Sequence, residues 1–222
     1  MNRWDWLALF DVYLMIFWCV TYIECIRIGI KEKTYCMPLL ALCMNLCWEA
    51  LSLVDYSLLS GYDIFAYSLY GVWTLLDLGI VATYIVYGKQ EFLKSIKGLS
   101  PTRRIGTGGG FVVYSLGMLA LVLTIILTMY ATIDNWKLYF SFSDNVIMSV
   151  LFIAMYYIRG GKRGQSLSIA ITKCIGTLCA TMTMILAGRL FGVVLGGICL
   201  LLDIVYIVIL AQHPKYCPTA EA

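Results

Sequence analysis

Seven long apolar runs constrain how this chain can fold. Each has about the length, roughly 20 residues, that a helix needs to cross the hydrocarbon core of a bilayer. A strand-built barrel would show shorter segments of strictly alternating polarity, which these runs lack. The sequence therefore predicts an all-α membrane protein, a bundle of seven transmembrane helices in a single domain over residues 1–222. The predicted helices cover about residues 6–28, 37–59, 64–87, 110–131, 139–158, 167–187 and 190–211.

The composition supports a membrane location. Hydrophobic residues make up 61% of the chain and charged residues 13%, against roughly half and a quarter in soluble domains. We therefore expect an integral, multi-pass protein whose surroundings are membrane lipid, with no nucleic-acid partner. The first run carries Asp11 and Glu24, and no small-residue cleavage pattern follows it, so we expect a helix rather than a signal peptide.

The basic residues predict the orientation. Of the 16 Lys and Arg residues, three fall on the side of the N-terminus and twelve on the opposite side, with Lys173 inside the sixth run. Loops rich in Lys and Arg stay in the cytoplasm. The sequence therefore predicts the N-terminus outside and the C-terminus in the cytoplasm.

The longest predicted loop, about 88–109, has two interpretations. Phe92, Leu93, Ile96 and Leu99 share one helical face, which predicts a short interfacial helix. An ordinary basic loop fits equally well. In either case, the three glycines at 108–110 predict a flexible joint before the next helix.

The last run carries two short patterns. Leu200–Ile204 resembles the segment Trp73–Leu78 of the third run, which fits a 3+1+3 pseudo-repeat of helices. Gly192 and Gly196 form a GxxxG pair, which predicts a close contact with another helix.

Three acids, Glu49, Asp77 and Asp203, lie near the middle of their runs. An ionised carboxylate at that depth costs roughly 2.5–3.5 kcal/mol on insertion scales, so it is protonated, paired or facing water. A protonated carboxyl group can serve as a proton donor. Alternatively, the acids pair with polar neighbours or with Lys173, which can neutralise only one of them, and merely hold helices together. A structural role is favoured for the acids nearer the interfaces, where water can reach them: Asp11, Glu24, Asp55, Asp63, Asp134 and Asp144.

Polar and aromatic side chains form stripes along five of the predicted helices, at spacings that place each stripe on one face. We expect the stripes to converge on one interior cavity lined by acids and aromatic rings. The stripes contain Asp11, Trp18 and Tyr22; Asn45, Trp48, Glu49, Ser52 and Tyr56; Tyr70, Trp73, Asp77 and Tyr84; Asp144, Asn145 and Met148; and Cys199, Asp203 and Tyr206.

Several motifs are missing from the sequence. It contains no DDxxD-type cluster for a magnesium diphosphate, no P-loop and no GxSxG elbow. The cysteines lack CxxC spacing, and there is one histidine, so no metal site is expected. The last run contains no lysine for a retinal Schiff base. We therefore expect neither a metal nor a cofactor.

The segment Asn45–Glu49 resembles the N-x-x-W-E motif of the small membrane-bound terpene cyclases. That family acts in fungal meroterpenoid and indole-diterpene pathways and has bacterial relatives that cyclise prenylated indoles. Three further segments are similar in order and rough spacing, so the resemblance covers nearly the whole chain. They are Trp73–Asp77, Gly164–Ser166 leading to Gly176 and Thr177, and Asp203 with Tyr206.

The resemblance implies a class II cyclisation, in which a carboxylic acid protonates an epoxide or terminal alkene of a prenyl chain. It implies Glu49 and Asp203 as the two catalytic acids, and our hypothesis is that Glu49 is the general acid and Asp203 its partner. A lipophilic, prenylated substrate would come from an upstream prenyltransferase and, where an epoxide is needed, an epoxidase. The residues expected around that substrate are Trp18, Tyr22, Asn45, Trp48, Trp73, Asp77 and Tyr206.

Two other functions are compatible with the sequence. A proton-coupled small-molecule transporter would also carry carboxylates at mid-membrane depth and a helix-triplet repeat, and a receptor-like or scaffold protein would need no chemistry. A transporter should show Gly/Pro-broken helices at mid-depth. The second, third and seventh runs contain one proline between them, Pro38, at the start of the second run. The lack of a proline at mid-depth favours the cyclase.

Overall fold

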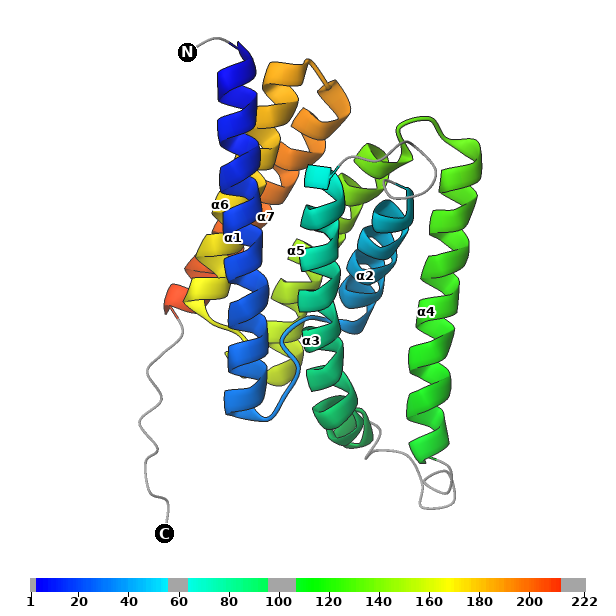
Figure 1. The fold of residues 1–222 in the computed structure, drawn as a ribbon. Coiled ribbons are helices and arrows are strands. Elements are labelled where there is room, and N and C mark those ends of the chain that lie inside the picture. The colour runs from blue at the N-terminus through cyan, green and yellow to red at the C-terminus, as the bar shows by residue number, and fades with distance from the viewer. Residues whose placement is uncertain (1–2, 56–63, 96–106, 213–222) are drawn as a thin grey trace.

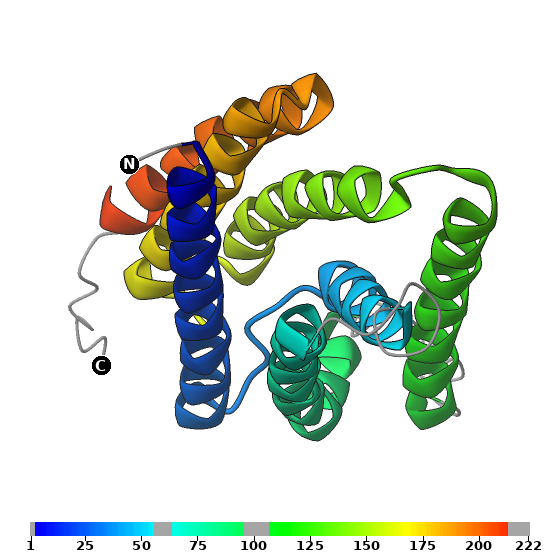
Figure 2. The same ribbon diagram turned by 45° about the horizontal axis from the view of Figure 1, so that its top comes forward.

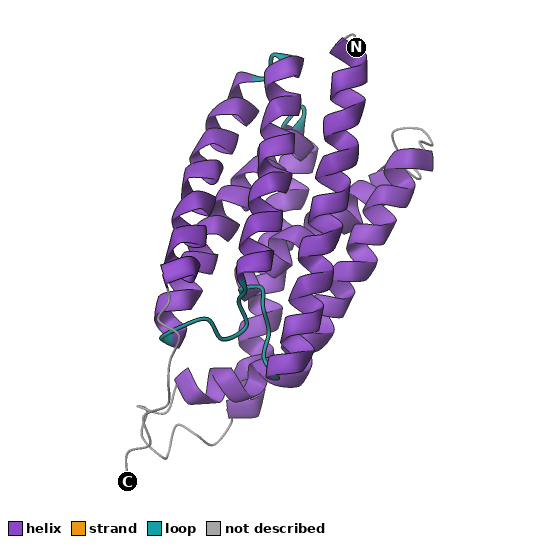
Figure 3. Ribbon diagram, turned by 90° about the vertical axis from the view of Figure 1, so that its left-hand side faces the viewer, coloured by secondary structure: helices purple, strands orange, loops and turns teal. Residues whose placement is uncertain are grey.

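A computed structural model describes residues 3–55, 64–95 and 107–212, and these residues form seven α-helices with no strand (Figures 1 and 3). The prediction of an all-α protein is confirmed. The helices are α1 (Arg3–Glu32), α2 (Leu39–Val54), α3 (Ile64–Ser95), α4 (Thr107–Thr132), α5 (Trp136–Arg159), α6 (Leu167–Ala187) and α7 (Leu190–Gln212).

Six of the helices are long and apolar enough to cross a membrane, which supports an integral, multi-pass membrane protein. The exception is α2, whose 16 residues are fewer than a straight span needs. The predicted end of that helix, near residue 59, lies outside the described residues. The seventh span and the 3+1+3 repeat therefore stay predictions.

Local sequence explains where several helices begin and end. Ser166 caps the start of α6, where its hydroxyl accepts a 3.1 Å hydrogen bond from the backbone N–H of Ile169. Gly160 ends α5 and Gly188 ends α6, both in the left-handed region at φ +66° and +69°. Glycine adopts that conformation without the steric cost that a Cβ would bring. A short turn follows Gly188, and α7 then packs back on α6.

Six helices form a ring, and the seventh lies outside it. Going round, α1 packs on α6, α6 on α7, α7 on α5, α5 on α2, α2 on α3 and α3 on α1. Figure 2 shows α4 apart at one edge, where it packs mainly on α2. The start of α1 and the end of α7 lie toward opposite ends of the bundle (Figure 1). Which end faces the cytoplasm stays a prediction.

The basic segment after the third predicted helix differs from expectation. Residues 89–95 continue α3 instead of forming a separate interfacial helix, and Ile96 and Leu99 lie outside the described residues. Phe92 packs on Phe111 and Tyr114 of α4, with ring centroids 5.8 and 5.6 Å apart, so this aromatic side chain faces protein. The glycines at 108–110 lie within the first turn of α4, so the predicted flexible joint there is wrong.

A cluster of ionic contacts joins three segments at the end of the bundle where α3 terminates. Glu91 of α3 pairs with Arg159 at 2.7 Å and with Arg163 at 3.5 Å, and it accepts a hydrogen bond from Thr34. The guanidinium of Arg159 also lies 4.5 Å from the ring centre of Tyr35. These contacts fix the α1–α2 and α5–α6 loops against α3, and so hold the ring closed at this end.

Candidate active site

A cavity of about 300 Å³ lies within the ring. Side chains from α1, α2, α3, α5 and α6 line it, so segments from both halves of the sequence contribute to one space. Much of its wall is aromatic, which suits a lipophilic ligand. The aromatic lining residues are Trp18, Tyr22, Trp48, Tyr70, Trp73 and Phe142.

The aromatic rings fix one another in position. Trp48 stacks on Trp73 with ring centroids 6.4 Å apart, and Tyr70 meets both edge-on at 5.2 and 5.8 Å. The indole N–H of Trp48 donates to the backbone carbonyl of Lys137 at 3.2 Å, which ties α2 to the start of α5. A cation within about 6 Å of such ring faces is stabilised by roughly 0.5–2 kcal/mol per ring.

Glu49 lies directly behind this wall. Its side chain is fully buried and does not line the cavity. The hydroxyl of Tyr22 donates to Glu49 Oε1 at 2.7 Å, and the amide of Asn45 donates to the same hydroxyl oxygen. Tyr22 and Asn45 both line the cavity, so they connect Glu49 with it.

A second carboxyl group, that of Asp77, accompanies Glu49. Asp77 is fully buried on α3 and interacts electrostatically with Glu49. Neither Asp77 oxygen has a hydrogen-bond partner among the described residues. Two carboxylates that interact in a dry interior repel each other, so the pair disfavours carrying two charges at once.

Asp144 is a functional candidate for which the sequence favoured a structural role. It was expected near an interface within reach of water, but it is only 3% exposed and lines the cavity, and its Oδ1 has no hydrogen-bond partner among the described residues. The reason is that α5 begins at Trp136 rather than near 139, which moves Asp144 more than two turns into the helix. The stripe of Asp144, Asn145 and Met148 was the signal that could have identified it.

Two other acids that were expected to face water also have protein partners. Asp55 is buried and pairs with Lys137. Asp11 lines the cavity on α1 and accepts a 3.1 Å hydrogen bond from Thr183 of α6. The interior of this bundle therefore contains more acids than their positions along the predicted helices suggested.

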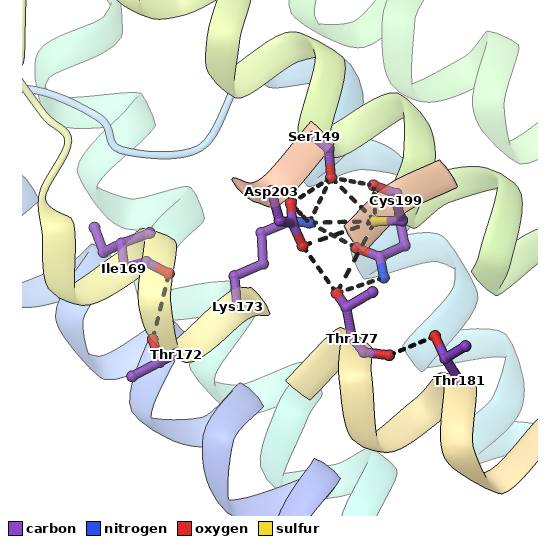
Figure 4. Close-up of polar contacts among 9 residues, drawn as sticks. Ser149, Ile169, Thr172, Lys173, Thr177, Thr181, Cys199 and Asp203 are labelled. Carbon is purple, nitrogen blue, oxygen red and sulfur yellow. Dashed lines mark hydrogen bonds and ion pairs between the residues drawn. The ribbon is translucent and has the colours of Figure 1, made fainter. Parts of the chain in front are cut away.

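Asp203 belongs to a separate, fully satisfied network between α5, α6 and α7 (Figure 4). Its Oδ1 pairs with Lys173 Nζ at 2.8 Å and accepts from Ser149 at 2.7 Å, while Thr177 donates to Oδ2 at 3.1 Å. Lys173 also donates to Asn145 Oδ1 at 2.9 Å. Asp203 and Lys173 are both fully buried. Pairing of one acid with Lys173 is an alternative that the sequence left open, and the acid is Asp203.

The structure places the expected site residues in three groups. Five of them line the cavity, Glu49 and Asp77 lie behind its wall, and Asp203 and Tyr206 do not contribute to its lining. Tyr206 instead packs on Phe152 with ring centroids 5.5 Å apart. Aromatic residues of the stripes on α1, α2 and α3 therefore meet at one cavity, whereas none of the three central acids is part of its lining. The five lining residues are Trp18, Tyr22, Asn45, Trp48 and Trp73.

The family described as Pyr4-like transmembrane terpene cyclases matches residues 2–215, nearly the whole chain. The chain belongs to this family. Among its relatives, the Pyr4-family terpene cyclase mfmH of Annulohypoxylon moriforme is 27% identical over 173 residues, which are 76% of this chain and 65% of the relative. The terpene cyclase macJ of Penicillium terrestre is 26% identical over 166 residues, 74% of this chain and 61% of the relative.

A third relative, the terpene cyclase paxB of Penicillium paxilli, is 22% identical over 172 residues, 77% of this chain and 66% of the relative. The chain spans slightly less than two thirds of the length of these curated relatives. No solved structure matches it. Membership of the Pyr4-like family supports an enzyme and does not favour the transporter interpretation. Among the described residues, no three His, Cys, Asp or Glu side chains are grouped as a metal ion would need.

Proposed function

We propose that this chain is a membrane-bound class II terpene cyclase that closes rings on the prenyl chain of a meroterpenoid or prenylated indole. The observation that carries the proposal is the aromatic cavity with Glu49 and Asp77 buried behind its wall. A prenyl chain could fold against these rings, and a proton held behind the wall could start the reaction.

In the proposed reaction, a proton that Glu49 supplies from behind the wall is delivered to the epoxide oxygen or to a terminal alkene carbon of the substrate. The epoxide C–O bond opens, or the alkene π pair forms the new C–H bond, and a carbocation results. The π electrons of the next alkene then attack this cation and close a ring. Loss of a proton from a neighbouring carbon ends the sequence with a new alkene, so the overall change is an isomerisation.

Asp203 and Asp144 have different roles in this proposal. Asp203 stays ionised against Lys173 and acts on the site through the contact of Lys173 with Asn145, which lines the cavity. Asp144 is the proposed acceptor of the final proton, because its carboxyl group lines the cavity. Acids in different surroundings can hold different protonation states at one pH, which is what donor and acceptor roles need.

The substrate class rests on the lipophilic cavity and on the family. The relatives' names describe terpene cyclases and specify no substrate. We propose that the substrate reaches the protein through the membrane, after a prenyltransferase has attached the isoprenoid chain. An epoxidase would act between the two enzymes where the cyclase uses an epoxide.

The test is to incubate the purified protein in lipid nanodiscs with plain and epoxidised prenyl-arenes and to identify products by mass spectrometry. Glu49→Gln keeps the shape of the side chain and removes the transferable proton, so conversion should fall by about 10²–10⁴-fold. Asp134→Asn, at an exposed position after α4, is the matched control and should convert substrate at the wild-type rate. If Glu49→Gln converts substrate at the wild-type rate, Glu49 is excluded as the acid. Proton-driven solute uptake in vesicles without any cyclisation would favour the transporter.

A further inference from the structure

Glu49 has no direct access to a molecule in the cavity. It is fully buried and does not line the space, whereas Tyr22 of α1 does. The hydroxyl of Tyr22 lies 2.7 Å from Glu49 Oε1, a distance at which the two groups share a hydrogen bond. A proton leaving Glu49 toward the cavity therefore meets the Tyr22 oxygen first.

The surroundings of Glu49 differ from those of an acid held permanently ionised. Its Oε2 has no hydrogen-bond partner among the described residues, and no ion pair is seen for it there. The ionisable groups that interact with it are Tyr22 and two further acids, Asp77 and Asp144. Asp203, by contrast, has Lys173 and two hydroxyl donors. Glu49 is thus the buried acid of the two whose surroundings suit a stored proton.

Asn45 completes the arrangement around the phenol. Its side-chain amide donates a hydrogen bond to the Tyr22 oxygen, and it lies one helical turn before Glu49 on α2. A donor at that position stabilises negative charge that develops on the phenol oxygen as its proton leaves. The ring of Tyr22 is held edge-on by Trp18, with centroids 5.9 Å apart, so the hydroxyl is fixed in place.

We infer that Tyr22 is the catalytic residue that donates the first proton to the substrate, and that Glu49 replaces that proton from behind the wall. This inference rests on the proposed cyclase function. The Tyr22 O–H bond breaks as the epoxide oxygen or alkene carbon supplies the electron pair for the new bond. In the same step, the proton of Glu49 moves to the Tyr22 oxygen. Tyr22 ends as a phenol and Glu49 as a carboxylate. The substrate gives up one proton in the last step, and the return of one proton to Glu49 before the next turnover leaves no net proton consumed.

The 2.7 Å contact between Tyr22 and Glu49 accommodates the hydrogen bond in either direction. With Glu49 ionised, the Tyr22 hydroxyl donates to Oε1. With Glu49 protonated, the carboxyl O–H donates instead, and the Tyr22 hydrogen is released toward the cavity. Asn45 donates to the phenol oxygen in both states and acts as a positioning residue.

The first experiment compares Tyr22→Phe, Glu49→Gln and the double variant in single-turnover assays with a prenyl-arene that the wild type converts. Phenylalanine keeps the ring that packs on Trp18 and removes the hydroxyl alone. Tyr22→Phe should lower the rate by at least about 10²-fold with little change in substrate affinity. The double variant should be no slower than Glu49→Gln, because both groups serve one proton transfer. Tyr157→Phe, at a position 66% exposed on α5, is the matched control and should keep the wild-type rate.

A second variant keeps the test decisive if Tyr22→Phe folds poorly. A fluorinated tyrosine at position 22 retains the hydroxyl and the packing but makes the phenol a stronger acid, so the rate of the first step should change. Tyr22→Phe at the wild-type rate, or losses that multiply in the double variant, would overturn the inference while leaving the cyclase intact. If neither the wild type nor Tyr157→Phe converts any prenyl-arene, the proposed function itself fails.

Discussion

The two buried acids implied as catalytic, Glu49 and Asp203, lie in different electrostatic surroundings. Asp203 has a lysine and two hydroxyl groups as partners, so its charge is balanced inside the bundle. Glu49 has a phenol as its hydrogen-bond partner and a second acid, Asp77, beside it. Removing a side chain therefore has different consequences at the two places: at Asp203 it leaves a buried cation unbalanced, and at Glu49 it removes a proton store.

The pairing of Asp203 with Lys173 predicts a large stability effect. Asp203→Asn or Lys173→Met should each destabilise the fold by about 3–5 kcal/mol, because one buried charge remains without its partner. Combining Lys173→Met with Asp203→Leu should recover much of that loss, since neither charge is then buried. Thermal unfolding in nanodiscs measures this. The matched control is Glu24→Gln in the exposed Glu24–Arg27 pair, which should unfold near the wild-type temperature. Single variants as stable as the wild type would contradict the pairing.

The position of Asp144 at the cavity predicts a change in products. Asp144→Asn removes the proposed acceptor of the final proton, so the last cation should lose its proton elsewhere or capture water. We expect slower turnover with new alkene isomers or alcohols, resolved by gas chromatography and mass spectrometry. Asp134→Asn should leave the product pattern unchanged. An unaltered pattern for Asp144→Asn would show that this carboxyl group takes no part in the last step.

At the scale of elements, apolar length predicted the helices well. The range 167–187 agrees with α6 to the residue, and α7 extends one residue beyond its predicted end. The third helix was predicted to end near residue 87, with an interfacial helix or a basic loop after it, whereas α3 continues to Ser95. A hydropathy pattern cannot show that Glu91 finds Arg159 and Arg163 as partners. Charges end a predicted span, yet a helix continues wherever the fold provides counter-charges.

The candidate site was predictable in part from residue spacing along single helices. The helical spacing of Trp18 and Tyr22, and of Asn45 and Trp48, correctly indicated which faces point inward. Spacing along one helix gives a direction but no depth relative to other helices. It could not distinguish a residue at the cavity from one behind its wall, as Glu49 is. Nor could it choose among acids for Lys173, because that choice depends on how α6 and α7 pack.

The contact between α6 and α7 gives a prediction at this scale. The GxxxG pair lies against α6 as expected: a Cβ built on Gly196 would overlap the side chain of Thr181, with Thr181 Cβ 3.0 Å away, and one on Gly192 would overlap Met184. Gly196→Ala should therefore destabilise the bundle by about 1–3 kcal/mol through overpacking. Gly197→Ala is the matched control, because nothing lies within 4 Å of a Cβ there. Equal unfolding temperatures for the two variants would contradict the close packing.

For the whole molecule, the ring of six helices decides which part of the bundle can hold a substrate. Near its Glu91 end, α1 and α3 pack closely, and a Cβ on Gly29 would lie 3.2 Å from the Thr83 side chain. Toward the other end both helices line the cavity, through Asp11 and Trp18 on α1 and Tyr70 on α3. The cavity thus lies nearer the end of the bundle where α1 begins.

The predicted orientation says which side of the membrane the cavity lies nearer. With three Lys and Arg residues on one side and twelve on the other, the N-terminus and the α4–α5 turn should lie outside the cytoplasm, and the cavity should lie nearer that side. Asp134→Cys in that turn should react with a membrane-impermeant maleimide added to intact cells. Lys162→Cys, in the α5–α6 loop at the other end, should react only after the membrane is opened. The wild type, treated in parallel, reports labelling of the native cysteines. The reverse pattern would invert the bundle and place the cavity nearer the cytoplasmic side of the bilayer, where a lipophilic substrate would have to reach it.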